Sequence, residues 1–122
     1  MENVKGEIIM LNLHKYGNDH PMSFELASYC ENDNLYVGLL TTEYGYPEPW
    51  QNLTVNLSVK CANNCAYIDT NNNGTEIIDW LVNNNLGRLT GKTRASGWCF
   101  YPEFEFNMDE LMKHVVSDHR IK

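Results

Sequence analysis

The stretch over residues 96–106 constrains most strongly what this chain can fold into, because it holds most of the large apolar side chains of the C-terminal third. From Phe100 onward one parity holds Phe100, Pro102, Phe104 and Phe106, and the other holds Tyr101, Glu103 and Glu105. Successive side chains of a strand point to opposite faces. We therefore expect a strand with one aromatic and one acidic face, on which the core condenses.

Further apolar runs predict the rest of a β-rich domain. Strands are expected over residues 7–13, 22–29, 35–40 and 53–59, with a short extended piece over 66–68. The second and third of these strands are expected to form a hairpin, because only a short polar stretch separates them. Residues 16–21 and 44–49 are expected to be loops, and residues 91–97 a polar lead-in to the aromatic strand.

Two helices are predicted. The first spans residues 76–85, with Thr75 as its cap and Gly87 placed to end it, and the second begins at Asn107, which forms a capping-box-like pair with Glu110. Their apolar stripes are Ile77, Ile78, Leu81 and Val82, and Met108, Leu111, Met112 and Val115. We expect an α+β fold, a mostly antiparallel β-sheet with two α-helices packed on it. The chain is expected to be one domain over residues 1–122, with its core over roughly residues 7–117.

The formal charge of −7 and the pI near 4.9 argue against direct nucleic-acid binding, because clustered Lys and Arg supply that affinity. An acidic surface suits docking on a basic protein groove, and it equally suits a soluble protein with surplus carboxylates. The first residues lack a basic region followed by a long apolar run, and nowhere do about 18 apolar residues follow one another. We therefore expect no membrane contact and a cytoplasmic location.

Cys61 and Cys65 carry the sharpest chemical signal, because their spacing allows one turn to present two zinc ligands. Cys30, at the end of one expected strand, and Cys99, at the entry of another, could supply the other two. The predicted cofactor is a structural Zn bound by Cys30, Cys61, Cys65 and Cys99, with His14, His20, His114 and His119 as substitutes. The alternative is that each cysteine is a small buried apolar residue.

Arg88, Lys92 and Arg94 place three cations within seven positions. They could grip an anion, or they could neutralise Glu103 and Glu105, which is the interpretation we favour. No nucleophile motif surrounds the serines and no Cys–His pairing follows from chain order alone, so no catalytic residue is predicted and the chain is not expected to be an enzyme. The histidines are expected to be solvated surface residues.

Several segments together resemble one known family. They are residues 53–57 (LTVNL), 69–72 (DTNN), 90–91 (TG) and 96–102 (SGWCFYP), followed by Phe104 and Phe106. This pattern is similar to the small uncharacterised family 4313 among the domains of unknown function, found in bacteria, phages and mobile elements, and it covers roughly residues 24–106. That family has no assigned catalytic residues to carry over. Cys30, Cys61 and Cys65 lie outside its pattern, so the family lends the zinc site no support.

The chain also resembles the type II-A anti-CRISPR proteins, small inhibitors of RNA-guided nucleases, some of which carry zinc. This resemblance implies a phage or mobile-element protein, acting in the host cytoplasm, that binds a host type II CRISPR nuclease and blocks its DNA loading or binding. Such nucleases line their channel with Lys and Arg. We expect Tyr44, Tyr46 and Trp50 to bind the partner, since loop aromatics are good anchors unless they fold back onto the core.

Two other functions remain open at this point. A small zinc-dependent enzyme would bind the metal with at most three protein ligands and leave one position open for water. A metal-free accessory protein of a mobile element would need no site of this kind. No oligomeric state follows from the sequence.

Overall fold

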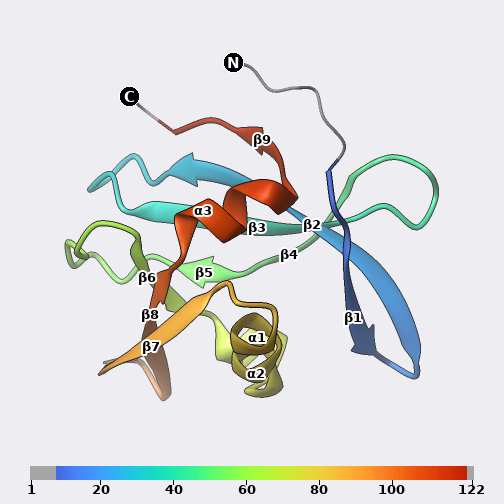
Figure 1. The fold of residues 1–122 in the computed structure, drawn as a ribbon. Helices are drawn as coiled ribbons and strands as arrows, with labels where there is room; N and C mark the ends of the chain where they lie inside the picture. The colour runs from blue at the N-terminus through green and yellow to red at the C-terminus, as the bar shows by residue number, and fades with distance from the viewer. Residues whose placement is uncertain (1–7, 121–122) are drawn as a thin grey trace.

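Two β-sheets share one hydrophobic core in the computed structural model, which describes residues 8–120 (Figure 1). The first sheet holds β1 (Leu11–Lys15), β2 (Asn18–Ser28), β3 (Leu35–Thr41) and β4 (Glu48–Asn52), with β9 (Val115–Asp118) paired to β2. The second holds β5 (Thr54–Val55), β6 (Cys65–Ile68), β8 (Cys99–Phe106) and β7 (Gly87–Ser96), in that spatial order. The helical segments are α1 (Thr70–Asn73), α2 (Glu76–Asn83), α3 (Met108–Leu111) and the 3₁₀ turn η1 (Met112–His114).

The prediction of a mostly antiparallel β-sheet with added helices is confirmed, although two sheets replace the expected one. Within residues 8–120, every strand pairing except that of β2 with β9 is antiparallel. No helix among residues 8–120 is long and apolar enough to cross a membrane.

Strand β2 organises the first sheet. Its pairing with β3 sets Phe24 opposite Leu39, which confirms the predicted hairpin. The other edge of β2 is shared, because β1 pairs with it up to Met22 and β9 pairs with it from Phe24 onward. β2 begins four residues earlier than predicted, since Tyr16 and Gly17 alone make the preceding turn with φ values of 54° and 81°. Glu7, the predicted start of the first strand, lies outside the described residues.

The predicted strand over residues 53–59 is wrong beyond its first positions. Only Thr54 and Val55 pair with β6, and the chain then turns away through Ser58, whose φ is 62°. The alternation in this stretch has another cause. Val55 and Leu57 pack against a small cluster around Cys61, so both side chains are partly buried although Leu57 has left the strand.

The first predicted helix is confirmed as α2, whose Ile77 and Leu81 are buried in the core, whereas Val82 of the predicted stripe is exposed. The second predicted helix is wrong after one turn. Asn107 caps α3, its side chain accepting a hydrogen bond from the Glu110 N–H, as expected. The chain then passes through η1 into β9, where the residues from Val115 gain ladder hydrogen bonds with β2. β-branched residues favour that outcome.

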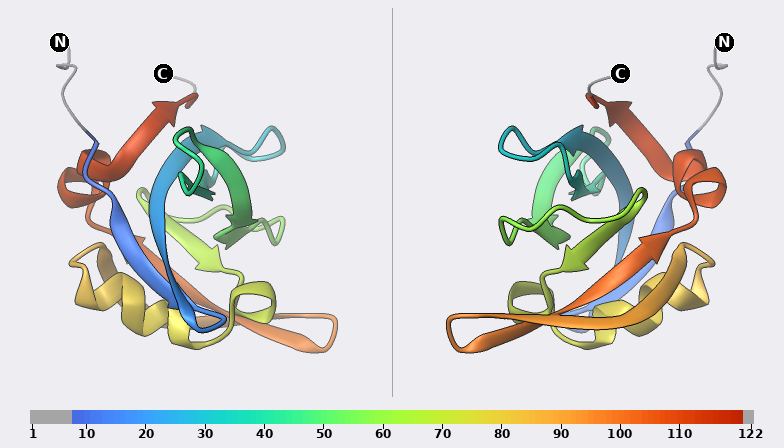
Figure 2. Two further views of the ribbon diagram at one scale, coloured as in Figure 1. Left: turned by 90° about the vertical axis from the view of Figure 1, so that its right-hand side faces the viewer. Right: turned by 90° about the vertical axis from the view of Figure 1, so that its left-hand side faces the viewer.

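Two further strands, besides β9, were not predicted. β4 includes Pro49, which a position at the edge of the first sheet tolerates because no further strand needs its missing N–H. β7 covers the predicted polar lead-in and forms a long hairpin with β8 that projects from the body of the molecule (Figure 2). Gly87, predicted to end the first helix, is instead the first residue of this strand.

The core takes side chains from both sheets and from α2. Phe24 and Val37 come from the first sheet, Phe104 from the second and Leu81 from α2, and all four are fully buried. The core-facing parity predicted for β8 is confirmed for Phe104 and Phe106 only, because Phe100 is exposed. Trp80 ties α2 to the first sheet, its indole N–H donating to the Asn12 carbonyl at 2.7 Å.

Substitution of Gly87 by Ala should destabilise the fold by about 2–4 kcal/mol. Its φ of +151° disfavours a side chain, and a Cβ atom there would collide with the Glu105 carbonyl oxygen and come within 2.6 Å of the Phe104 ring. The matched control is Gly91→Ala in the same strand, where nothing lies within 4 Å of the added atom. That variant should lose only about 1 kcal/mol of backbone strain. Urea unfolding measures both, and equal losses would contradict the packing argument.

Candidate functional site

A small second cluster lies apart from the main core, on the second sheet. Cys61, Cys65 and Tyr67 are buried there, with Val55, Leu57 and Tyr101 packed around them. Cys65 and Tyr67 belong to β6, and Cys61 precedes that strand in a turn closed by the Cys65 N–H, which donates to the Ala62 carbonyl at 3.1 Å. The C-x3-C spacing therefore does bring two thiols into one cluster.

Asn34 fixes the chain that leads into this cluster. Its side-chain oxygen accepts a hydrogen bond from the Cys61 N–H at 2.9 Å, and its amide nitrogen donates to the Val59 carbonyl at 2.7 Å. Asn34 is itself buried at the end of the β2–β3 turn. One amide from the β2–β3 turn thus holds the irregular segment that was predicted to be a strand.

Burial raises the pKa of the Cys61 and Cys65 thiols, and the carboxylate of Glu103 raises both further. Glu103 is only 5% exposed, so the predicted acidic face of this strand is partly buried. Its carboxylate accepts a hydrogen bond of 2.6 Å from the Thr90 hydroxyl of the neighbouring strand. Thiols with a raised pKa hold less thiolate at neutral pH, which disfavours a nucleophile here and favours a packing role.

The predicted set of four cysteine ligands is not assembled in this structure. β6 meets β8 where Cys65 lies opposite Glu105. Cys99 lies six positions earlier on β8, and at 3.3 Å per residue this puts it about 20 Å from that point. Cys99 instead forms a hydrogen bond with Tyr101, and Cys30 is exposed after the end of β2. Over residues 8–120 no three His, Cys, Asp or Glu side chains gather as a metal site.

The histidines named as substitute ligands are engaged elsewhere. His114 is buried with Nδ1 2.7 Å from the Ile9 carbonyl, and His20 is bonded to Glu43, so the expectation of solvated histidines is wrong for both. His14 is exposed and lies 2.8 Å from the carboxylate of Asp19. His119 is also exposed. The zinc site stays a prediction that this geometry does not assemble.

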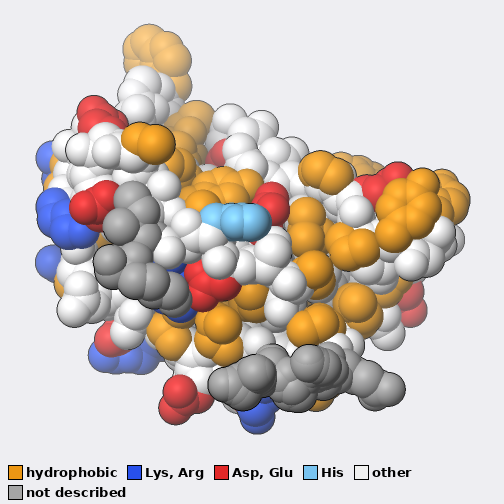
Figure 3. Space-filling view, turned by 90° about the horizontal axis from the view of Figure 1, so that it is seen from above, with side chains coloured by type: hydrophobic (Ala, Val, Ile, Leu, Met, Phe, Trp, Pro, Cys, Tyr) orange, Lys and Arg blue, Asp and Glu red, His pale blue; other side chains and the backbone are white. Residues whose placement is uncertain are grey.

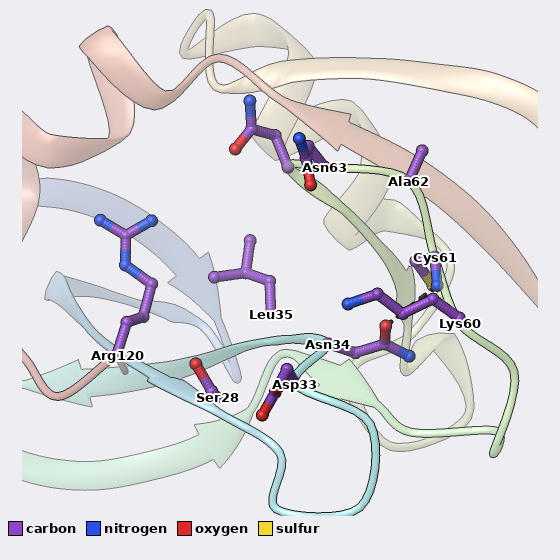
Figure 4. Close-up of a pocket in the computed structure, with 10 residues that line it drawn as sticks. Ser28, Asp33, Asn34, Leu35, Lys60, Cys61, Ala62, Asn63 and Arg120 are labelled. Atoms are coloured by element: carbon purple, nitrogen blue, oxygen red, sulfur yellow. Dashed lines mark hydrogen bonds between the residues drawn. The ribbon is translucent and has the colours of Figure 1, made fainter. Parts of the chain in front are cut away.

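A cavity of about 420 Å³ opens beside Cys61, between the β2–β3 turn and residues 60–64 (Figure 4). Two cations line it, but both are engaged: Lys60 donates to the Asn32 carbonyl at 3.1 Å, and Arg120 makes hydrogen bonds of 3.0 and 2.9 Å with the Asp118 carboxylate. The rest of the lining is mostly polar and includes three asparagines, Ser28 and Asp33, beside Cys61. The cavity therefore offers hydrogen-bonding groups rather than a set of reactive ones.

Of the three cations of β7, one has the role that the sequence predicted. Arg88 forms an ion pair of 2.7 Å with Glu105, which is the neutralising role that we favoured. Arg94 forms a hydrogen bond with Tyr67, and Lys92 is close enough to lower the pKa of both buried thiols in part.

The predicted partner-binding aromatics divide into two kinds. Tyr44 and Tyr46 are 73% and 59% exposed in the turn between β3 and β4, and their edge of the molecule shows orange side chains beside red carboxylates (Figure 3, right). Trp50 folds back: its ring centre lies 4.7 Å from that of His20, and it packs against the core. We call residues 42–48 the acidic-aromatic loop, because they hold these two tyrosines, Glu43 and Glu48 but no Lys or Arg.

A histidine tethers the acidic-aromatic loop to the first sheet. His20 Nδ1 bonds to the Glu43 carboxylate, and His20 Nε2 lies 3.0 Å from the Lys15 carbonyl. The hydrogen bond with Glu43 is the largest cause of the raised pKa of His20, which burial opposes and Asp19 assists. Sequence reasoning missed this pair, and the only signal was a histidine next to a proline at a strand entry.

Comparison with known proteins yields one match. Residues 23–120 match the model of a family described as a domain of unknown function (DUF4313), which confirms the family resemblance noted in the sequence. No curated protein and no solved structure matches the chain.

Alkylation should distinguish the four thiols. With iodoacetamide at neutral pH, Cys30 should react first, and Cys61 and Cys65 at least about tenfold more slowly, because they are buried and their pKa is raised. Peptide mass spectrometry measures each rate. In denaturant the four rates should converge. Equal rates in the folded protein would contradict the burial of this cluster.

Replacement of Glu43 by Gln should lower the pKa of His20 towards its ordinary value of 6.5. In the unmodified protein the folded-state pKa lies above that value, so the pair stabilises the fold below pH 6.5 and loses this contribution as pH rises through the raised pKa. An NMR titration of the His20 ring measures the shift. Glu48→Gln is the control and should leave it unchanged. An equal effect of both variants would mean that net charge, not the hydrogen bond, sets the pKa.

Proposed function

The chain belongs to the DUF4313 family of domains of unknown function, and from that premise we propose that it is a binding protein that inhibits a host RNA-guided nuclease of the type II CRISPR class. The inhibitor would occupy the basic surface along which the nuclease loads DNA. The resemblance to anti-CRISPR proteins suggests the partner and a phage or mobile-element origin. The acidic-aromatic loop is the observation that carries the proposal.

The loop combines two properties of a good interface anchor. Tyr44 and Tyr46 present large amphipathic side chains to solvent, and Tyr is enriched among residues that dominate binding energy. Glu43 and Glu48 flank them within a chain of net charge −7. Carboxylates around aromatic anchors complement a groove lined with Lys and Arg and speed the encounter with it.

The loop is also held in place before any partner arrives. Its turn is closed by the Gly45 N–H, which donates to the Thr42 carbonyl at 3.1 Å, and Glu43 is bonded to His20. Pro47 restricts the chain further where it enters β4. A fixed loop loses less conformational entropy on binding, so more of the contact energy contributes to affinity.

Zinc bound by the cysteines remains part of the proposal as a structural element only. Metal analysis of the purified protein, alone and as the Cys61→Ser and Cys65→Ser variants, tests it. Zinc that is lost together with thermal stability would support a structural site.

The proposed inhibition has an order-of-addition test. The protein, incubated with a guide-loaded type II nuclease before target DNA is added, should suppress cleavage, and it should lose most of this effect when added after DNA has bound. Replacement of Tyr44 and Tyr46 by Ala should weaken nuclease binding by at least about tenfold for the pair. Phe100→Ser is the matched control, since Phe100 is 70% exposed but lies in a different hairpin.

Two results would contradict the proposal. Unimpaired cleavage at excess protein would remove the inhibitor function. Inhibition that survives the double tyrosine variant would remove the acidic-aromatic loop as its docking surface.

A further inference from the structure

One side of β8 faces the core, but β8 is longer than the core, so the side chains at its outer end on this side are exposed. Phe106 and Phe104 on this side are buried, Pro102 is half-buried, and Phe100 is 70% exposed. The hairpin of β7 and β8 projects from the body at this end (Figure 2), and an orange side chain stands at the projecting end in Figure 3 (top). We call residues 89–102 the arm. Trp98 at its turn is 99% exposed.

The uncovered side of the arm carries no charge. Cross-strand pairing sets Ala95 opposite Phe100 and Thr93 opposite Pro102, and opposite residues of a ladder share a face. The two cations of the arm lie on the other face, because Arg94 lies opposite Tyr101 and Lys92 is near the thiols of the second cluster. The apolar face is therefore neutral, and the cations point away from it.

The outer edge of the arm along β7 is unsuited to strand addition. Pairing between β7 and β8 shifts register between Leu89 and Thr93, where Gly91 has a φ of +96°. A bulge and a lysine on an edge strand are devices that block edge-to-edge pairing. Strand addition at this edge is therefore disfavoured, whereas a contact through the face and the turn of the arm would bury Phe100 and Trp98.

We propose that two copies of this chain pack the apolar faces of their arms against each other across a two-fold axis. A neutral face stacks on itself without opposing like charges, whereas an anionic partner such as nucleic acid would be recognised by Lys92 and Arg94 on the other side. A two-stranded ribbon with both faces in water is only marginally stable, and a second copy would cover one of them. The inference rests on the arm and is independent of the proposed inhibitor function.

The exposed area sets the expected strength of the contact. A Trp or Phe side chain offers about 150–250 Å², so Trp98 and Phe100 alone expose roughly 300 Å² per copy, to which Leu89, Ala95 and Pro102 add. This is less than the roughly 600–800 Å² per partner that standard interfaces bury, and it falls in the range of weak, transient contacts. The dimer should therefore be weak and reversible, so that it forms only at high protein concentration.

Sedimentation velocity of the full chain over a range of concentrations tests the dimer. The mass should rise from 14.1 kDa towards twice that value. Phe100→Ser and Trp98→Ser should each raise the dissociation constant by at least about tenfold, while Tyr44→Ser, a matched exposed aromatic outside the arm, should not change it. Circular dichroism and thermal unfolding show whether the variants keep the fold.

The salt dependence of the dissociation constant tests whether the contact is apolar. Each copy carries a net charge of −7, so repulsion opposes pairing and its screening should tighten the dimer between about 50 and 500 mM NaCl. A dimer that weakens with salt, or one that is insensitive to Phe100→Ser, would overturn the apolar face-to-face contact. So would a chain that stays at 14.1 kDa at every concentration, or one whose arm instead binds a labelled single-stranded oligonucleotide.

Discussion

The fold depends on the backbone of one buried residue, Leu53, at which the chain leaves the first sheet and enters the second. Its N–H donates to the Val37 carbonyl at 2.9 Å, and its carbonyl accepts from the Asp69 N–H at 2.9 Å. Its side chain is fully buried in the shared core. A shift of either sheet would leave one of these buried groups unpaired, which is costly. This crossing therefore fixes β6, and through its pairing with β6 it positions β8 and the arm.

The sequence predicted the elements whose pattern is local and failed where the pattern depends on distant partners. The β2–β3 hairpin and α2 follow from alternation and from a helical stripe, and both are confirmed. β7 has almost no buried face, so it shows no alternation, and its pairing with β8 is the only reason that it is a strand. For β8 the parity was right, but parity does not tell how far the core extends, and Phe100 lies beyond it.

At the candidate site, too, the sequence did not reveal the polar residues whose partners are distant in the chain. Asn34 and Asn73 look like ordinary turn residues, yet both are buried and bond backbone groups that lie far away in the chain. Asn73 donates to the Asn52 carbonyl at 2.9 Å, beside the crossing at Leu53. Such amides satisfy the irregular segments that join the sheets. The cysteine spacing predicted a pair of close thiols correctly, but the reach of Cys99 along β8 could not be deduced without the register of β6 on β8.

The acidic-aromatic loop and the arm differ in chemistry and lie at separate ends of the molecule (Figure 1). The loop carries Glu43 and Glu48 beside its tyrosines, whereas the apolar face of the arm is uncharged. The net charge of −7 thus acts in opposite directions: it favours docking of the loop on a basic groove and opposes pairing of two arms. Arms that pair would leave both loops exposed, so a weak dimer would not block the docking of either loop on a partner. The two surfaces are therefore compatible within one molecule. Because of the net charge, we expect binding of a basic partner to the loop to be stronger than pairing of two arms.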